Sequence, residues 1–269
     1  MHMRIIQTFP PYANTGVDTR YVMIWAMNEE AKRVAAESIL LTKQEMQKAA
    51  TERVAEIAKE FTEGFKFLED YQKSVTFFGS TTSTEGDPYY ESARTLSGRI
   101  VTELGYSVVS GGGPGIMEAA DRGAFEAGGN SLGLLIKLPH TQPTNSYVKK
   151  SISFYYFFAR KVCLAFGAEV FIFFPGGYGT LDEFFEIITL IQTRKMTGAP
   201  LICVGSEYWN KLKDLMETEL LSRGFITKDD LSLFTICDNH DEIIEAIKKV
   251  PVKTNIPIAE LEDALKATA

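Results

Sequence analysis

The sequence has few residues that could cross-link the chain or bind a metal. Its 269 residues include 3 cysteines and 3 histidines. Cys163, Cys203 and Cys237 are odd in number, lie far apart and have apolar neighbours. We therefore expect buried thiols in a reducing cytosol, and neither a disulfide framework nor a zinc site. No metal site is predicted.

Long apolar runs are also missing. None approaches the roughly 20 residues that a membrane-spanning helix needs. The N-terminal residues do not show the charged-then-apolar order of a signal peptide. The sequence thus predicts a cytoplasmic protein that does not associate with membranes.

Positive charge is in short supply, since the formal net charge is −7. This balance argues against a general surface for nucleic acid or anionic membranes, so a phosphate ligand would need local positive groups. A composition of 45% hydrophobic and 23% charged residues is that of an ordinary globular protein with a large core. A Walker A loop is absent, and no glycine run completes the dinucleotide fingerprint GxGxxG.

The most informative stretch runs from Val170 to Glu186 and reads VFIFF, PGGYGT and LDEFFE. The five apolar residues predict a buried strand that ends at Pro175. A turn containing Gly176, Gly177 and Gly179 follows, with Tyr178 among the glycines, and Thr180 is expected to cap the next helix. Strand, glycine turn and helix N-terminus together predict an anion site for a phosphate group.

A purely structural interpretation of the same motif is a capping box, in which Glu183 returns a hydrogen bond to the Thr180 backbone. That interpretation accounts for Thr180 and Glu183. It does not account for three glycines in four positions beside a tyrosine, so we favour a ligand-binding loop.

Two further turns join a predicted strand to a helix through small residues. The segment 110–118 reads SGGGPGIME and contains Gly112 and Gly113, which favours a mononucleotide over NAD or ATP. The segment 78–83 reads FGSTTS. Its Ser80 either lines a phosphate, ribose or base pocket or caps the next helix, and the sequence supports both equally.

Two adjacent cations, Arg160 and Lys161, lie in an aromatic segment with no acid between Ser151 and Ala168. Arg160 is predicted to pair with Glu183 or with substrate oxygens. For Lys161, a ligand role and a side chain that only reaches solvent are about equally supported.

Alternating strand and helix patterns after Lys73 predict an α/β fold: a Rossmann-like, doubly wound parallel sheet with an N-terminal helical extension. The expected domains are an arm and long amphipathic helix over 1–73, a nucleotide-binding catalytic domain over 74–250 and a tail over 251–269. Within the first part, 1–28 is expected to be irregular and 29–72 helical. Strands are predicted near 75–79, 107–110, 131–136, 169–174, 199–204 and 234–237, and helices near 88–104, 115–127, 152–166, 180–195, 207–222 and 240–249.

The long polar loop 137–150 is predicted to form a lid or a wall of the substrate site. It contains His140, to which we assign no catalytic role, because isolated histidines are more often structural.

The glycine motifs resemble those of the Lonely Guy family, cytokinin riboside 5′-monophosphate phosphoribohydrolases that were long mislabelled as lysine decarboxylases. PGGYGTLDE matches the family pattern PGGxGTxxE, and SGGGPGIM matches SGGGxGxM. The family also carries an Arg-Lys pair at the position of Arg160 and Lys161. Its plant members have a histidine where this sequence has Phe158, a difference that bears on substrate preference.

The resemblance implies hydrolysis of the N-glycosidic bond of a nucleoside 5′-monophosphate, either a cytokinin riboside monophosphate or an AMP-like nucleotide, without a cofactor. Glu183 would then stabilise positive charge on the ribose and orient the attacking water, and Arg160 would keep Glu183 ionised. The turn amides would hold the phosphate, and Asp182 and Thr189 would shape the pocket. The alternative is a binding protein for a phosphorylated ligand, such as a molybdenum-cofactor carrier.

The long helix and the aromatic face of Phe154, Tyr155, Phe157 and Phe158 exceed what one domain readily covers. We therefore expect a homodimer or a higher even oligomer that uses the Arg160 helix, as the resemblance also implies. The long N-terminal helix would add to that contact or pack on its own domain.

Overall fold

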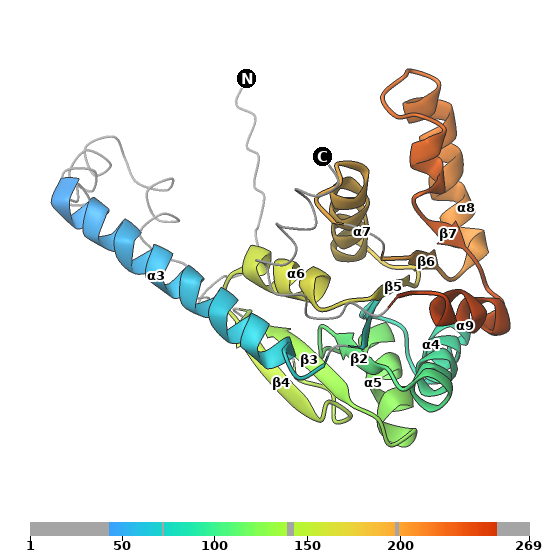
Figure 1. The fold of residues 1–269 in the computed structure, drawn as a ribbon, viewed down its shortest axis with the longest axis horizontal. Coiled ribbons are helices and arrows are strands. Elements are labelled where there is room, and N and C mark those ends of the chain that lie inside the picture. Colours follow the sequence, from blue (N-terminus) through green and yellow to red (C-terminus); the bar gives the residue numbers. More distant parts are fainter. Residues whose placement is uncertain (1–42, 72, 139–142, 197–198, 252–269) are drawn as a thin grey trace, which may run out of the picture. The chain divides into compact units, whose positions relative to one another are not determined.

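The computed structural model describes residues 43–71, 73–138, 143–196 and 199–251 (Figure 1). The predicted irregular arm, the first part of the predicted long helix, His140 and the tail after residue 251 lie outside these residues. The contacts divide the chain into two units, 1–57 with 137–142, and 58–136 with 143–269. Helix α3 (Lys43–Leu68) confirms the described part of the predicted long helix, although it ends four residues earlier than expected.

The second unit contains one sheet of seven parallel strands, in the order β4-β3-β2-β1-β5-β6-β7. The strands are β1 (Ser74–Phe78), β2 (Ser107–Ser110), β3 (Ser131–Ile136), β4 (Lys150–Phe154), β5 (Val170–Phe173), β6 (Leu201–Cys203) and β7 (Thr235–Ile236). The chain runs outward from β1 to β4 in one direction and from β5 to β7 in the other. The order therefore reverses between β1 and β5, and this reversal confirms the doubly wound topology.

Helices connect the strands and cover both faces of the sheet. They are α4 (Pro88–Arg99), extended by the π-helical η1 (Ile100–Leu104), α5 (Ile116–Glu126), α6 (Phe157–Phe166), α7 (Tyr178–Gln192), α8 (Ser206–Leu215), extended by η2 (Met216–Leu221), the short η3 (Asp229–Ser232) and α9 (His240–Lys248). Helices α4, α5 and α9 lie on one face of the sheet, and α6 and α7 lie on the other (Figure 1).

The edge strand β4 was not predicted, because residues 152–166 were interpreted as one helix. The structure instead forms a strand over Lys150–Phe154, and helix α6 starts at Phe157. The alternation of Ser151 and Ser153 with Ile152 and Phe154 is the period of a strand and was the available signal. Phe154 is fully buried, so it is not part of the exposed aromatic face to which we assigned it.

Each face of the sheet has its own apolar core. One is built with α6, α7 and α8 and includes Leu164, Phe184 and Trp209. The other is built with α4, α5 and α9 and includes Leu96 and Ile244. The cysteines are free thiols, as expected; Cys163 and Cys203 are buried, but Cys237 is partly exposed, contrary to the prediction. No helix in the described segments is long and apolar enough to span a bilayer.

One carboxyl group lies in the interior beside the second glycine turn. Asp121 of α5 is completely buried, and its Oδ2 atom accepts hydrogen bonds from Ser110 Oγ at 2.7 Å and Asn145 Nδ2 at 2.8 Å. Within the described residues its Oδ1 atom has no partner. Burial raises the pKa of Asp121 to about 7, and the two hydrogen bonds oppose this rise.

This raised pKa predicts a pH-dependent stability. Between the unfolded pKa, about 4, and the folded pKa near 7, the folded state binds more protons than the unfolded state. The contribution of Asp121 therefore falls as pH rises through this window and is level above it. In urea titrations, Asp121→Asn should remove this term, so that the stability of the wild type relative to the variant falls by on the order of 2 kcal/mol between pH 5 and pH 8.

The matched control is Asp214→Asn, which changes an exposed aspartate on α8. Its unfolding free energy should follow the wild-type pH dependence. A wild-type pH dependence in Asp121→Asn as well would show that Asp121 has no raised pKa in the folded protein.

Candidate functional site

Three loops meet at the carboxyl ends of the central strands, where ligands of open α/β sheets bind. The loops follow β1, β2 and β5. Backbone hydrogen bonds join them: Ser80 N–H donates to the Pro175 carbonyl at 2.9 Å, and Ile116 N–H donates to the Ser80 carbonyl at 2.9 Å. The three predicted turns therefore form one site at the point where the strand order reverses.

The glycine motif after β5 starts its helix earlier than predicted. Helix α7 begins at Tyr178, and its N-cap is Gly177, which offers no side-chain hydrogen bond. Thr180 is thus the third residue of the helix and neither its N-cap nor half of a capping box. The structural interpretation of Glu183 as a capping residue is consequently wrong.

Gly176 is required by close packing inside the loop. A Cβ atom there would lie 2.1 Å from Thr180 Oγ1 and 3.0 Å from the Ser80 nitrogen. The Tyr208 hydroxyl of α8 donates to the Gly176 carbonyl at 2.9 Å and fixes the turn from outside. The sequence analysis did not identify Tyr208, although its position shortly after β6 placed it at this edge of the sheet.

Gly177 and Gly179 have no such requirement. Neither has a positive φ angle, and a Cβ atom at either position would meet nothing within 4 Å. The backbone is open on this side, and Tyr178 between them is 94% exposed. The amides of Tyr178, Gly179 and Thr180 find no acceptor within the described segments, as is usual in the first turn of a helix. Open backbone, free amides and the helix dipole suit an anion.

Hydroxyl groups of the loop after β1 form hydrogen bonds within the loop. Ser80 Oγ lies 2.8 Å from Thr82 Oγ1 and accepts the Thr82 amide at 3.1 Å. These bonds close a local turn, while α4 is capped by Asp87, which accepts the Tyr89 amide at 2.8 Å. Ser80 therefore does not cap the following helix.

The residues that donate hydrogen bonds to Asp121 also stabilise the second glycine turn. Gly112 has a φ of 70°, and its amide donates to Ser110 Oγ at 2.8 Å. Asn145 contacts the same turn twice. Its backbone N–H donates to the Gly112 carbonyl, and its side-chain Nδ2 donates to the Gly113 carbonyl, both at 3.0 Å. Asn145 lies in the loop predicted as a lid, and sequence analysis did not identify its role.

Arg160 of α6 is buried, with 8% of its surface exposed, and reaches the second glycine turn. Its Nε donates to the Leu134 carbonyl at 2.6 Å. A Cβ atom at Gly111 would lie 2.1 Å from its Nη2 atom, so glycine at this position makes room for the guanidinium. Among the described residues, Arg160 makes no ion pair, so the predicted direct pairing with Glu183 is absent; the two charges interact at longer range.

Glu183 is partly buried on the first turns of α7. Burial raises its pKa to about 7, while the positive charge of Arg160 acts in the opposite direction. Arg160 thus acts in the predicted direction and favours the ionised form of Glu183, although desolvation is the larger effect. A carboxyl group with a pKa near neutrality can both accept and release a proton.

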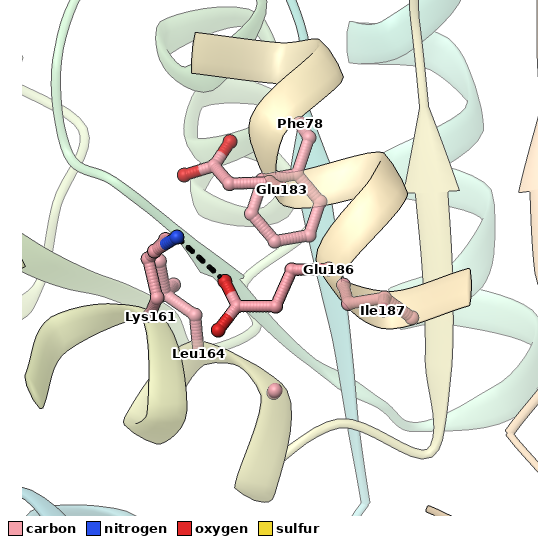
Figure 2. A pocket seen from close by; sticks show the side chains of 7 residues that line it. Phe78, Lys161, Leu164, Glu183, Glu186 and Ile187 are labelled. Atoms are coloured by element: carbon pink, nitrogen blue, oxygen red, sulfur yellow. Dashed lines mark ion pairs between the residues drawn. The ribbon is translucent and has the colours of Figure 1, made fainter. Parts of the chain in front are cut away.

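Lys161 links the two helices of the site. Its Nζ atom lies 3.0 Å from Asp182 Oδ2 of α7. It also lies 2.8 Å from Glu186 Oε2 on the same helix (Figure 2). Asp182, a predicted site residue, thus forms an ion pair with Lys161. Glu186 was not predicted to be a site residue. Thr189 is exposed, and its hydroxyl donates to the Phe185 carbonyl of its own helix at 2.6 Å, so it does not reach the site.

A cavity of about 10 Å³, room for about one water molecule, lies between α6 and α7 (Figure 2). Its lining combines two carboxyl groups and one cation with apolar groups: Phe78, Lys161, Leu164, Ala165, Glu183, Glu186 and Ile187. The described part of the chain thus places space for a water beside Glu183.

Comparison with known proteins finds several that are similar to this chain. A family model described as "possible lysine decarboxylase" matches residues 117–247. A cytokinin riboside 5′-monophosphate phosphoribohydrolase of Arabidopsis thaliana, LOG5, is 27% identical over 65% of this chain and 77% of its own length. The enzyme of the same name from Rhodococcoides fascians is 28% identical over 65% of this chain and 89% of its own length.

Among solved structures, a structural-genomics target determined by X-ray crystallography shares the fold. It is 23% identical, the match covers 66% of this chain and 99% of that one, and the TM-score is 0.50. Over the matched residues the chain is thus similar to a family described as possible lysine decarboxylases and to cytokinin riboside 5′-monophosphate phosphoribohydrolases.

Proposed function

We propose that this protein hydrolyses the N-glycosidic bond of a nucleoside 5′-monophosphate and releases the free base and ribose 5-phosphate. The observation that carries the proposal is the position of Glu183, a carboxyl group with a pKa near 7, on the same helix whose open N-terminal turn suits a phosphate. The two similar enzymes reported above are named as cytokinin riboside 5′-monophosphate phosphoribohydrolases.

In this proposal the phosphate binds at the start of α7. The free amides of Tyr178, Gly179 and Thr180 supply donors, and the helix dipole supplies positive potential in a protein of net charge −7. Lys161 is engaged by two carboxylates, so we assign it to holding α6 and α7 together and not to the phosphate. The second glycine turn, with Gly112 and Gly113, borders the sugar.

The chemistry requires a negative group near the anomeric carbon. As the bond between C1′ and the base nitrogen breaks, positive charge develops on the ribose, and the Glu183 carboxylate stabilises it. A water then forms the new C1′–O bond and gives a proton to Glu183. Glu183 passes this proton to the nitrogen of the departing base and so returns to its carboxylate form. The space for one water beside Glu183 supports this role.

Arg160 contributes a fixed positive charge to the same site. Its guanidinium is held by the Leu134 carbonyl, which leaves other N–H groups directed toward the glycine turn. We propose that these groups bind substrate oxygens, and that the charge limits the rise of the Glu183 pKa.

The proposal predicts strong dependence on the 5′-phosphate. AMP should be cleaved, whereas adenosine should be cleaved at least about 100-fold more slowly in kcat/KM, because the anchored phosphate orients the sugar. Chromatographic detection of free adenine measures both rates. Equal rates on the two compounds would rule out the α7 phosphate site, and tight binding of AMP without release of base would favour the alternative of a phosphorylated-ligand carrier.

We also propose a homodimer through α6. The helix carries Phe157, Phe158 and Phe166, and Tyr155 lies just before it; all four side chains are exposed in the single chain. Exposed aromatic clusters of this kind are typical of interfaces.

Light scattering should therefore report a dimer for the wild type and a larger monomer fraction for Phe157→Asp, which places a charge on this face. The control is Phe225→Asp: Phe225 is 70% exposed, close to the 56% of Phe157, but lies after η2 and not on α6. A wild-type monomer at working concentration, or equal dissociation by both variants, would contradict the proposal.

A further inference from the structure

The last part of α3 packs directly on the helix that carries Arg160. It lies before residues 117–247, which the family model matches. Phe61 contacts Phe158 with ring centroids 6.3 Å apart, and Phe65 contacts Phe166 at 4.5 Å. Gly64 lets the two helices approach closely, since a Cβ atom there would lie 2.5 Å from Cys163 Sγ. Residues 58–68 are therefore part of the core on this face of the sheet.

A single carboxylate of this segment binds the turn that leads into α6. Glu60 Oε1 accepts the Tyr155 amide at 2.5 Å, and Glu60 Oε2 accepts the Tyr156 amide at 3.2 Å. Hydrogen bonds to an ionised acceptor are stronger than neutral ones. The negative charge also lies at the N-terminal end of α6, where the helix dipole stabilises it.

The bound turn is connected to Arg160 by the first hydrogen bond of the helix. The Tyr156 carbonyl accepts the Arg160 amide at 3.1 Å. The Tyr156 amide thus donates to Glu60, and the Tyr156 carbonyl accepts a hydrogen bond from the backbone of Arg160. The guanidinium has its own anchor at the Leu134 carbonyl, so a shift of the turn would strain or break that contact.

We propose that Glu60 is a positioning residue: it fixes the β4–α6 turn and thereby sets Arg160 and Lys161 in the site. The N-terminal helix then contributes to the activity although it lies outside the matched segment. This inference rests on the proposed function for its kinetic test, but the contact itself is independent of the reaction.

The test compares Glu60→Ala, Glu60→Gln and the control Glu63→Ala. Glu63 lies three residues further along α3, is exposed and pairs only with Lys59 at 3.7 Å among the described residues. Glu60→Ala should lower kcat/KM for AMP about tenfold, the size expected for losing hydrogen bonds to a charged group. Glu60→Gln keeps one carbonyl acceptor and should recover part of the loss, and Glu63→Ala should match the wild type.

Amide hydrogen exchange of Tyr155 and Tyr156 provides a readout that does not depend on turnover. It should become about tenfold faster in Glu60→Ala and stay unchanged in Glu63→Ala. If the wild type binds AMP without cleaving it, the proposed function fails, and the positioning role is then tested by AMP affinity, which should fall about tenfold in Glu60→Ala. If Glu60→Ala does not fold, Glu60→Gln carries the same tests with smaller effects.

Unchanged kcat/KM or AMP affinity in Glu60→Ala would overturn the inference, even if the exchange became faster. A loss of activity that follows the melting temperature in all three variants, the Glu63 control included, would also overturn it, because the effect would then be general destabilisation of α3.

Discussion

The site depends on a buried positive charge. Removing a guanidinium from water is costly unless polar partners replace the water, and Arg160 has the Leu134 carbonyl and the longer-range charge of Glu183. Position 111 in the second glycine turn must be glycine, because a Cβ atom there would overlap the guanidinium of Arg160. Glu60 accepts hydrogen bonds from the turn that precedes α6, the helix of Arg160. The second glycine turn, the turn before α6 and the carboxyl group on α7 therefore all interact with Arg160 or with the backbone that positions it.

Two carboxyl groups of the domain have similarly raised pKa values but different surroundings. Asp121 is sealed among neutral donors and has no cationic partner among the causes of its shift. Glu183 borders a cavity and lies within the field of Arg160 and Lys161. Asp121 therefore maintains the shape of the glycine turn, whereas we propose that Glu183 acts on a bound molecule. A shifted pKa alone would not separate these roles.

Much of the fold follows from local sequence patterns. Apolar runs such as VFIFF predict the central strands because both faces of a parallel sheet are buried, and the glycines mark the turns beside the point where the strand order reverses. The edge strand β4 was missed, because its serines alternate with apolar residues and the helix after it has the stronger pattern. Threonine favours the N-cap position and so predicts a helix start at Thr180, but the helix begins two residues earlier, at Tyr178, with Gly177 as its N-cap.

Contacts between segments that are far apart in the chain could not be predicted from the sequence. Glu60 and Tyr155 are 95 positions apart, and Tyr208 and Gly176 are 32 apart, so no local pattern joins them. The pairing of Arg160 with Glu183 was predicted from residue types alone. In the structure the guanidinium donates instead to the backbone carbonyl of Leu134 in β3.

The central claim is that the ionised Glu183 carboxylate drives the reaction, and the pH dependence of kcat/KM for AMP tests it most directly. In the wild type the rate should rise with pH through an apparent pKa near 7, as Glu183 loses its proton, and then level off. Glu183→Gln should lower the rate roughly 100-fold, about 3 kcal/mol, and any pH dependence left in this variant belongs to the AMP phosphate, with a pKa of about 6. A wild-type profile that matches the variant in shape, or a variant as fast as the wild type, would contradict the account.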